Sequence, residues 1–199
     1  MNVADIAVSF SREAASFDAS KHFKFLVAHG PFENIQNFIS KKPWSPIVWA
    51  NGYRAKKNFV SSSVISLDFD DGDWTVQDAI DWVVSANLSA IVATSRNHQL
   101  PKNGKPAVDR FRLVIDAELC TSLDDFEYTM RTYMESIPCD KACKDGGRFY
   151  FACREVVWTK FDGQKARWLT CPFEETQEAK ELAYGSVDPE DMRNLVTLP

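Results

Sequence analysis

The chain has 199 residues, a formal net charge of −5 at pH 7 and a hydrophobic fraction of 45%, and it includes 6 Trp and 14 Phe. A chain of this size and composition can bury a substantial core, so we expect one medium-sized globular domain, with or without a small appendage. No apolar run approaches the ~20 residues that span a bilayer. No basic segment precedes the first apolar residues, as it would in a signal peptide. We therefore expect no membrane association and a cytoplasmic location.

The charge is unevenly distributed along the chain. Acidic residues gather at 68–73 and in the C-terminal third. Two other stretches are basic: one contains Arg96, Lys102, Lys105, Arg110 and Arg112, and the other contains Arg54, Lys56 and Lys57, with Lys41 and Lys42 upstream. Local basic patches can hold phosphates even when the whole chain is acidic. A solvated surface is the alternative, and the position of the patches relative to Asp68 decides between them.

The apolar pattern predicts strands and helices in the first half of the chain. Pro31 suits the first turn of a helix, and Asp73 or Thr75 can cap another. Strands are expected at 5–11, 22–28, 45–50 and 63–70, and helices at 32–42 and 74–87.

The second half continues the alternation less regularly. Ser122 can cap a helix that Pro138 ends, and the long polar loop at 96–109 has the length of a functional loop. Strands are expected at 89–95, 110–116, 147–152 and 155–161, the last two as neighbours, and helices at 122–137 and 173–185. Strands that alternate with helices without regular βαβ repetition indicate an α+β or mixed α/β fold with a central sheet.

The stretch SVISLDFDDGD places Asp68 and Asp70 on one face of a strand, because successive side chains of a strand point to opposite faces. Two carboxylates at this spacing are hard-oxygen ligands for Mg²⁺ or Mn²⁺. An acidic turn over 70–73 that only caps the next helix is the alternative. An Asp inside an apolar strand is costly, however, unless it is paired or ligating. The pattern therefore favours a metal site, while the opposite face buries Ile65, Leu67 and Phe69.

A third carboxylate, Asp116, ends the strand expected at 110–116. By alternation, it shares a face with Arg110 and Arg112. If this strand neighbours the Asp68 strand, three carboxylates can hold two divalent ions, one activating a hydroxyl and one binding a triphosphate. An exposed sheet face with charge pairs is the alternative.

His98 and Arg148 are candidate phosphate ligands. His98 follows the strand at 89–95 in a polar, basic loop, from which its imidazole can donate a hydrogen bond to a nucleotide phosphate. Arg148 follows a Gly-Gly pair and either binds phosphate or pairs with an acid.

The 5 cysteines are an odd number in a chain without a secretory signal, so we expect reduced thiols. Cys139 and Cys143 could begin a zinc site with Cys153 and Cys171. Their spacing to those two is irregular and no His lies nearby, so buried free thiols are the expectation.

The order of these features resembles the three motifs of the archaeo-eukaryotic primase superfamily, above all its phage and plasmid primase–polymerase domains. Asp68 and Asp70 match the first motif, an Asp-x-Asp strand. Ser95 and His98 match the second, Ser-x-His, with one additional residue between them. Asp116 matches the third, a hydrophobic strand ending in Asp. The resemblance runs from residue 45 to residue 151.

The resemblance implies an α+β fold in which an RRM-like catalytic sheet packs against a smaller N-terminal α/β unit. We expect a catalytic domain over 1–171, with the unit over about 1–60 and the core over about 61–171, followed by a C-terminal helix and tail over 172–199.

The resemblance also implies roles for individual residues. Mg²⁺ or Mn²⁺ would be held by Asp68, Asp70 and Asp116, with His98 as a further catalytic residue that contacts the incoming nucleotide. The nucleotide-binding set would be Ser95, His98, Arg54, Arg112 and Arg148. The nucleic-acid-binding set would be Arg96, Lys102, Lys105, Arg110, Lys56 and Lys57.

The implied activity is DNA-templated nucleotidyl transfer by two-metal catalysis: a primase or primase–polymerase that makes or extends primers in phage or plasmid replication. The expected partners are a single-stranded DNA template, nucleoside triphosphates and a replicative helicase, fused or separate. A phage-encoded protein would work in the host cytoplasm, either alone or as the N-terminal part of a longer replication protein. Two alternatives stay open: a metal-dependent nuclease that uses the same carboxylates, and a non-catalytic module that binds single-stranded nucleic acid.

Overall fold

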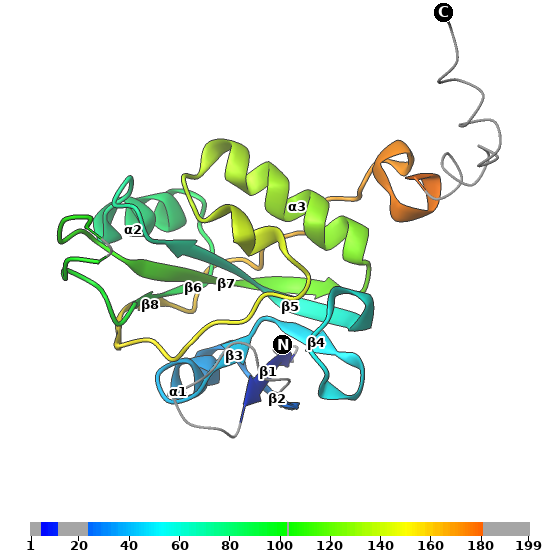
Figure 1. The fold of residues 1–199 in the computed structure, drawn as a ribbon, viewed down its shortest axis with the longest axis horizontal. Coiled ribbons are helices and arrows are strands. Elements are labelled where there is room, and N and C mark those ends of the chain that lie inside the picture. The colour runs from blue at the N-terminus through cyan, green and yellow to red at the C-terminus, as the bar shows by residue number, and fades with distance from the viewer. Residues whose placement is uncertain (1–4, 12–23, 103, 181–199) are drawn as a thin grey trace, which may run out of the picture.

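A sheet of five strands runs through the middle of the fold, and a sheet of three strands lies against one of its faces (Figure 1). The structure, a computed structural model, describes residues 5–11, 24–102 and 104–180. All paired neighbours are antiparallel. The large sheet has the order β4 (Ile47–Trp49), β5 (Phe59–Phe69), β7 (Phe111–Cys120), β6 (Ala90–Thr94) and β8 (Glu155–Lys160). The small sheet has the order β2 (Phe25–Gly30), β1 (Ile6–Ser11) and β3 (Trp44–Ser45).

Two helices, α2 (Val76–Ser85) and α3 (Leu123–Ser136), cover the other face of the large sheet (Figure 1). Thr75 caps α2 through a capping box with Asp78, and the Ser122 hydroxyl accepts from the amide of the third residue of α3. Shorter pieces are helical for one turn: α1 (Gln36–Ile39) and the 3-10 turns Phe32–Ile35, Ala50–Gly52, Lys56–Asn58, Lys141–Lys144 and Phe173–Glu175. Among the described residues, no helix combines the length and the apolar character needed to cross a bilayer.

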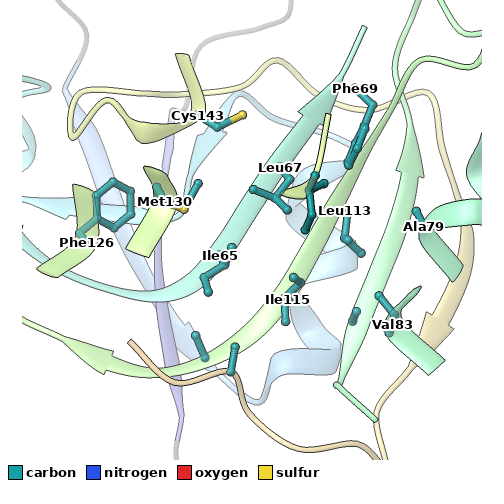
Figure 2. Close-up of a cluster of buried hydrophobic side chains, with 14 of the residues drawn as sticks. Ile65, Leu67, Phe69, Ala79, Val83, Leu113, Ile115, Phe126, Met130 and Cys143 are labelled. Carbon is teal, nitrogen blue, oxygen red and sulfur yellow. The ribbon is translucent and has the colours of Figure 1, made fainter. Parts of the chain in front are cut away.

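Two hydrophobic cores lie on opposite faces of the large sheet because its central strands are apolar on both faces. On the helix face, alternate residues of β5 and β7 pack against α2 and α3, as Figure 2 shows for Ile65, Leu67, Phe69, Leu113, Ile115, Val83 and Phe126. On the other face, Val64, Ile91 and Val114 pack against the small sheet and the turn that begins at Phe32. Buried apolar area of this kind is the main source of stability.

The mixed α+β class expected from the sequence is confirmed. The expected pairing of 147–152 with 155–161 is wrong: Tyr150 makes a single bridge to Trp44, and β8 pairs with β6. The helix expected at 32–42 is reduced to a 3-10 turn and four α-helical residues, because a turn at Lys41 and then Pro43 end it. The expected tail helix runs beyond the described residues. The domain boundaries stay predictions, although β4, from the predicted N-terminal unit, belongs to the large sheet.

Candidate active site

The end of β5 carries the carboxylate pair. Asp68 is the penultimate residue of β5 and only 6% exposed, and Asp70 is the first residue after the strand. The backbone of Asp68 is held on both sides: its amide donates to Cys143 Sγ (3.2 Å), and its carbonyl accepts from the amide of Asp140 (2.8 Å). The turn after α3 therefore fixes the position at which Asp68 leaves the sheet.

Two guanidinium groups neutralise Asp68. Arg112, its register partner on β7, places Nε 3.0 Å from Oδ1, and Arg148 places Nη2 3.2 Å from Oδ2. The same Arg148 nitrogen lies 2.9 Å from Asp140 Oδ2. Both guanidinium carbons also lie over the ring of Tyr150, at 4.6 and 5.2 Å from its centroid. A carboxylate has about four lone-pair sites, so Asp68 keeps acceptor capacity for a further ligand.

The groups behind Asp68 are buried and hydrogen-bonded. The Tyr150 hydroxyl donates to the carbonyl of Ser66 (2.9 Å), and burial raises the pKa of Tyr150 well above its usual range, so its hydroxyl stays neutral. All five cysteines are free. The Cys139 thiol donates a hydrogen bond to Cys143, which lowers the pKa of Cys143 and raises that of Cys139.

A cavity of about 320 Å³ opens on the carboxylate pair and brings four cationic side chains to it. Three aromatic residues and three small or polar ones complete the wall. The lining residues are Asp68, Asp70, Ser95, Arg96, Asn97, Lys102, Arg112, Arg148, Phe149, Tyr150, Phe151 and Ala152. A second cavity, of about 880 Å³, shares Asp70 and lies beside the C-terminal half of α3. The smaller cavity has four cationic side chains and two carboxylates, so it suits a polyanionic ligand.

The loop between β6 and β7 supplies cations to the acidic turn. Lys102 Nζ lies 2.9 Å from Asp70 Oδ2. Lys105 pairs with Asp71, and its hydrogen bond lowers the pKa of that carboxyl. Both lysines were predicted to contact nucleic acid, and in this structure each neutralises an aspartate.

Arg110 is a structural residue in this fold, which corrects its predicted contact with nucleic acid. Its side chain is fully buried. Its guanidinium donates to the carbonyls of Asp70 (3.0 Å), Asn97 (3.0 Å) and Pro106 (3.1 Å), and also to that of Leu100. One side chain thus ties the cavity loop to the turn after β5.

The structure does not bring Asp116 to the carboxylate pair. Asp116 lies opposite Val64, whereas Asp68 lies opposite Arg112. The four-residue offset corresponds to about 13 Å along a strand. Asp116 pairs with Lys165 (3.1 Å) instead, and burial raises the pKa of its carboxyl. The expected group of three carboxylates is therefore corrected to a pair.

His98 is not one of the residues that line the cavity. His98 lies in a turn in which its amide donates to the Ser95 carbonyl (3.1 Å). There, Nδ1 accepts from the amide of Arg110 (3.2 Å), and Nε2 lies 3.9 Å from Asp109. The residue that lengthens the predicted Ser-x-His motif completes this turn, so Ser95 and Asn97 reach the cavity and His98 does not.

The other predicted basic residues lie around the cavity or further away. Arg54 is exposed, with its guanidinium carbon 4.7 Å from the centroid of the Phe149 ring, which lines the cavity. Lys56 pairs with Glu127 (2.8 Å) on α3, and Lys57 is exposed.

The residues present fit one divalent ion better than two. Among the described residues, no three His, Cys, Asp or Glu side chains form a group that could hold a metal. Mg²⁺ in nucleotide sites, however, is usually bound by one or two carboxylates together with substrate phosphates and water. Asp68 and Asp70 on one cavity wall meet that requirement.

Sequence reasoning missed several residues of the site, among them Asp140, Cys143, Phe149 and Phe151. Asp140 carried a local signal, because it follows Pro138 and its side chain caps the next 3-10 turn. The alternation of Arg148, Tyr150 and the two phenylalanines was a second signal, since it places both Phe rings on one face of an extended segment.

Two solved structures are similar to this one. The primase–polymerase (AEP) domain of cyanophage S-2L aligns with 91% of this chain and 88% of its own, at 11% identity and a TM-score of 0.41. Primase RepB' aligns with 98% of this chain and 64% of its own, at 12% identity and a TM-score of 0.42. No family model matches the sequence, and no curated protein matches it.

Proposed function

We propose that this protein is a primase or primase–polymerase: it transfers nucleotidyl groups from nucleoside triphosphates to the 3′-hydroxyl of a nucleotide or primer paired with a single-stranded DNA template, and it releases pyrophosphate. The observation that carries the proposal is the composition of the smaller cavity. It combines the carboxylate pair Asp68 and Asp70 with four cationic side chains. A nuclease needs the carboxylates but has less use for so many cations at the same point.

The cations have distinct parts in the proposed reaction. Arg148 and Arg112 would hold the triphosphate, because guanidinium groups bind phosphate oxygens with directed, charge-assisted hydrogen bonds. Lys102 is 34% exposed on its loop and can move from Asp70 to a phosphate. Asp140 would keep Arg148 oriented when Asp68 binds a metal ion.

Asp68 and Asp70 would hold a single Mg²⁺ or Mn²⁺ ion together with the triphosphate. When bound, such an ion neutralises charge on the transferring phosphoryl group and lowers the pKa of a coordinated hydroxyl. We further propose that the template is a replicating phage or plasmid DNA that a helicase, fused or separate, makes single-stranded.

The test is incorporation of labelled nucleotides. The full chain is incubated with single-stranded DNA, labelled nucleoside triphosphates and Mg²⁺ or Mn²⁺, and the products are sized. Asp70→Asn should reduce synthesis by about 100-fold or more, because the ion loses a ligand where charge develops in the transition state. Asp81→Asn, a matched change on the exposed side of α2, should leave synthesis unchanged.

Three outcomes contradict the proposal. A cut template with no incorporated nucleotide indicates a nuclease. Template binding without either reaction indicates a non-catalytic module. Full synthesis by Asp70→Asn places the reaction elsewhere in the protein.

A further inference from the structure

The end of the cavity at Arg148 continues into a pair of aromatic rings. Phe149 and Phe151 follow Arg148 directly in the chain, are both half-buried and both line the cavity. Their ring centroids lie 5.5 Å apart at an interplanar angle of 68°. Tyr150, between them, packs in the core beneath the small sheet, and its ring also forms part of the cavity wall. Both Phe rings line the same cavity as Arg96 and Arg148, although Arg148 leaves the segment on the side of Tyr150.

The hydrophobic core supports Phe149 from behind. The ring of Phe25 meets it edge-on, with centroids 6.0 Å apart, and Trp49 in turn meets Phe25 at 5.0 Å. Both supporting residues are 2% exposed. An aromatic ring held in this way loses little conformational freedom when a ligand packs on it.

Each of the two rings has an arginine over its face. The guanidinium carbon of Arg54 lies 4.7 Å from the centroid of Phe149, whereas that of Arg96 lies 5.9 Å from the centroid of Phe151. A planar group stacked between a ring and a guanidinium needs about 7–8 Å, or two van der Waals contacts. Arg96 is exposed on its loop, so a movement of about 1–2 Å would provide that spacing.

We propose that Phe151, together with Arg96 and supported by Phe149, stacks the nucleobase of the nucleotide bound in this cavity. The inference rests on the proposed function, because it assigns the base of the same nucleotide. Phe151 is three positions after Arg148, or about 10 Å along an extended chain. This distance leaves room for the ribose between the phosphates and the base.

Stacking on these groups explains how one pocket accepts any base. Every nucleobase offers a π face, so contacts to an aromatic ring and a guanidinium plane discriminate little between bases. The hydrogen-bonding edge of the base stays available for pairing with a template. Selection of the nucleotide is then left to the template strand.

The test compares two ligands that share phosphates and differ in the base. Binding of ATP and of inorganic tripolyphosphate, each with Mg²⁺, is measured by calorimetry for the full chain. Phe151→Leu should weaken ATP binding about tenfold, because the base loses the aromatic ring on which it stacks, and should leave tripolyphosphate binding unchanged. Phe151→Tyr, which keeps the ring, should retain the affinity for ATP.

Phe161→Leu is the matched control, because Phe161 is 41% exposed, packs on Phe32 and does not line the cavity. Its affinity for both ligands should equal that of the wild type. Equal weakening of both ligands by Phe151→Leu, or no weakening of ATP, overturns the stacking role. The role is also overturned if the wild type binds ATP no more tightly than tripolyphosphate. A wild type that binds neither ligand overturns the proposed function itself, and the inference with it.

Discussion

At the scale of single residues, the site depends on buried charges that have partners. Arg110 lies just before β7 and Arg112 lies on it, two positions apart, yet their side chains have different roles. Arg112 reaches the cavity and neutralises Asp68, whereas Arg110 is enclosed by backbone carbonyls. Burying a charged group costs free energy, and a fold tolerates that cost only where hydrogen-bonding or oppositely charged partners surround the group. The sequence pattern alone does not separate these two roles.

Replacing Arg110 should therefore destabilise the whole fold. Arg110→Met leaves the carbonyls of the loop and of Asp70 without their donor, so we expect the free energy of unfolding to fall by about 3–5 kcal/mol. Urea denaturation measures the change. Arg154→Met, on an exposed arginine, should stay within about 0.5 kcal/mol of the wild type. Equal stability of the two variants would show that Arg110 does not organise the loop.

Asp116 should affect stability rather than catalysis. Burial raises the pKa of its carboxyl in the folded state above 3.8, the ordinary pKa of an Asp. At a pH between these two pKa values, the carboxyl is mostly protonated in the folded protein and mostly ionised in the unfolded chain. This group's contribution to the free energy of unfolding therefore falls as the pH rises above 3.8 through the raised pKa. Asp116→Asn should lack that decline in urea denaturation across this pH range and keep nucleotide incorporation. Loss of incorporation by a folded Asp116→Asn would return Asp116 to the active site.

At the scale of elements, the turn after β5 sets the direction of Asp70. Gly72 occupies this turn with φ +83°, a conformation that side chains with a Cβ rarely adopt. A Cβ there would also lie 2.8 Å from the Cβ of Val108, in the chain that leads into β7. The turn therefore packs closely against the loop whose carbonyls accept hydrogen bonds from Arg110.

Gly72→Ala should shift Asp70 and lower incorporation, with a loss of about 1–3 kcal/mol in the free energy of unfolding. Gly104→Ala is the matched control: its φ is +76°, but a Cβ would meet nothing within 4 Å. This variant should lower the free energy of unfolding only by the backbone strain, about 1 kcal/mol, and should preserve incorporation. If both variants lose activity equally, the contact with Val108 does not position the site.

At the scale of the whole molecule, the carboxylate pair could be predicted and the group of three could not. Asp68 and Asp70 belong to one strand, where a period of two determines their common side. Whether Asp116 joins them depends on the register between β5 and β7, which neither strand encodes alone. The same limit hid Asp140 and Cys143, which reach Asp68 only after α3 has packed on the sheet. Local periodicity is readable in a sequence, whereas contacts between distant segments depend on the packed fold.

The most direct measurement is a crystal structure of the full chain with Mn²⁺ and a non-hydrolysable nucleoside triphosphate. The account predicts an anomalous peak for manganese within coordination distance, about 2.0–2.4 Å, of oxygens from Asp68 and Asp70, with the triphosphate on Arg148 and Arg112. A metal at Asp116, or a triphosphate outside the cavity that these residues line, would contradict the proposed site.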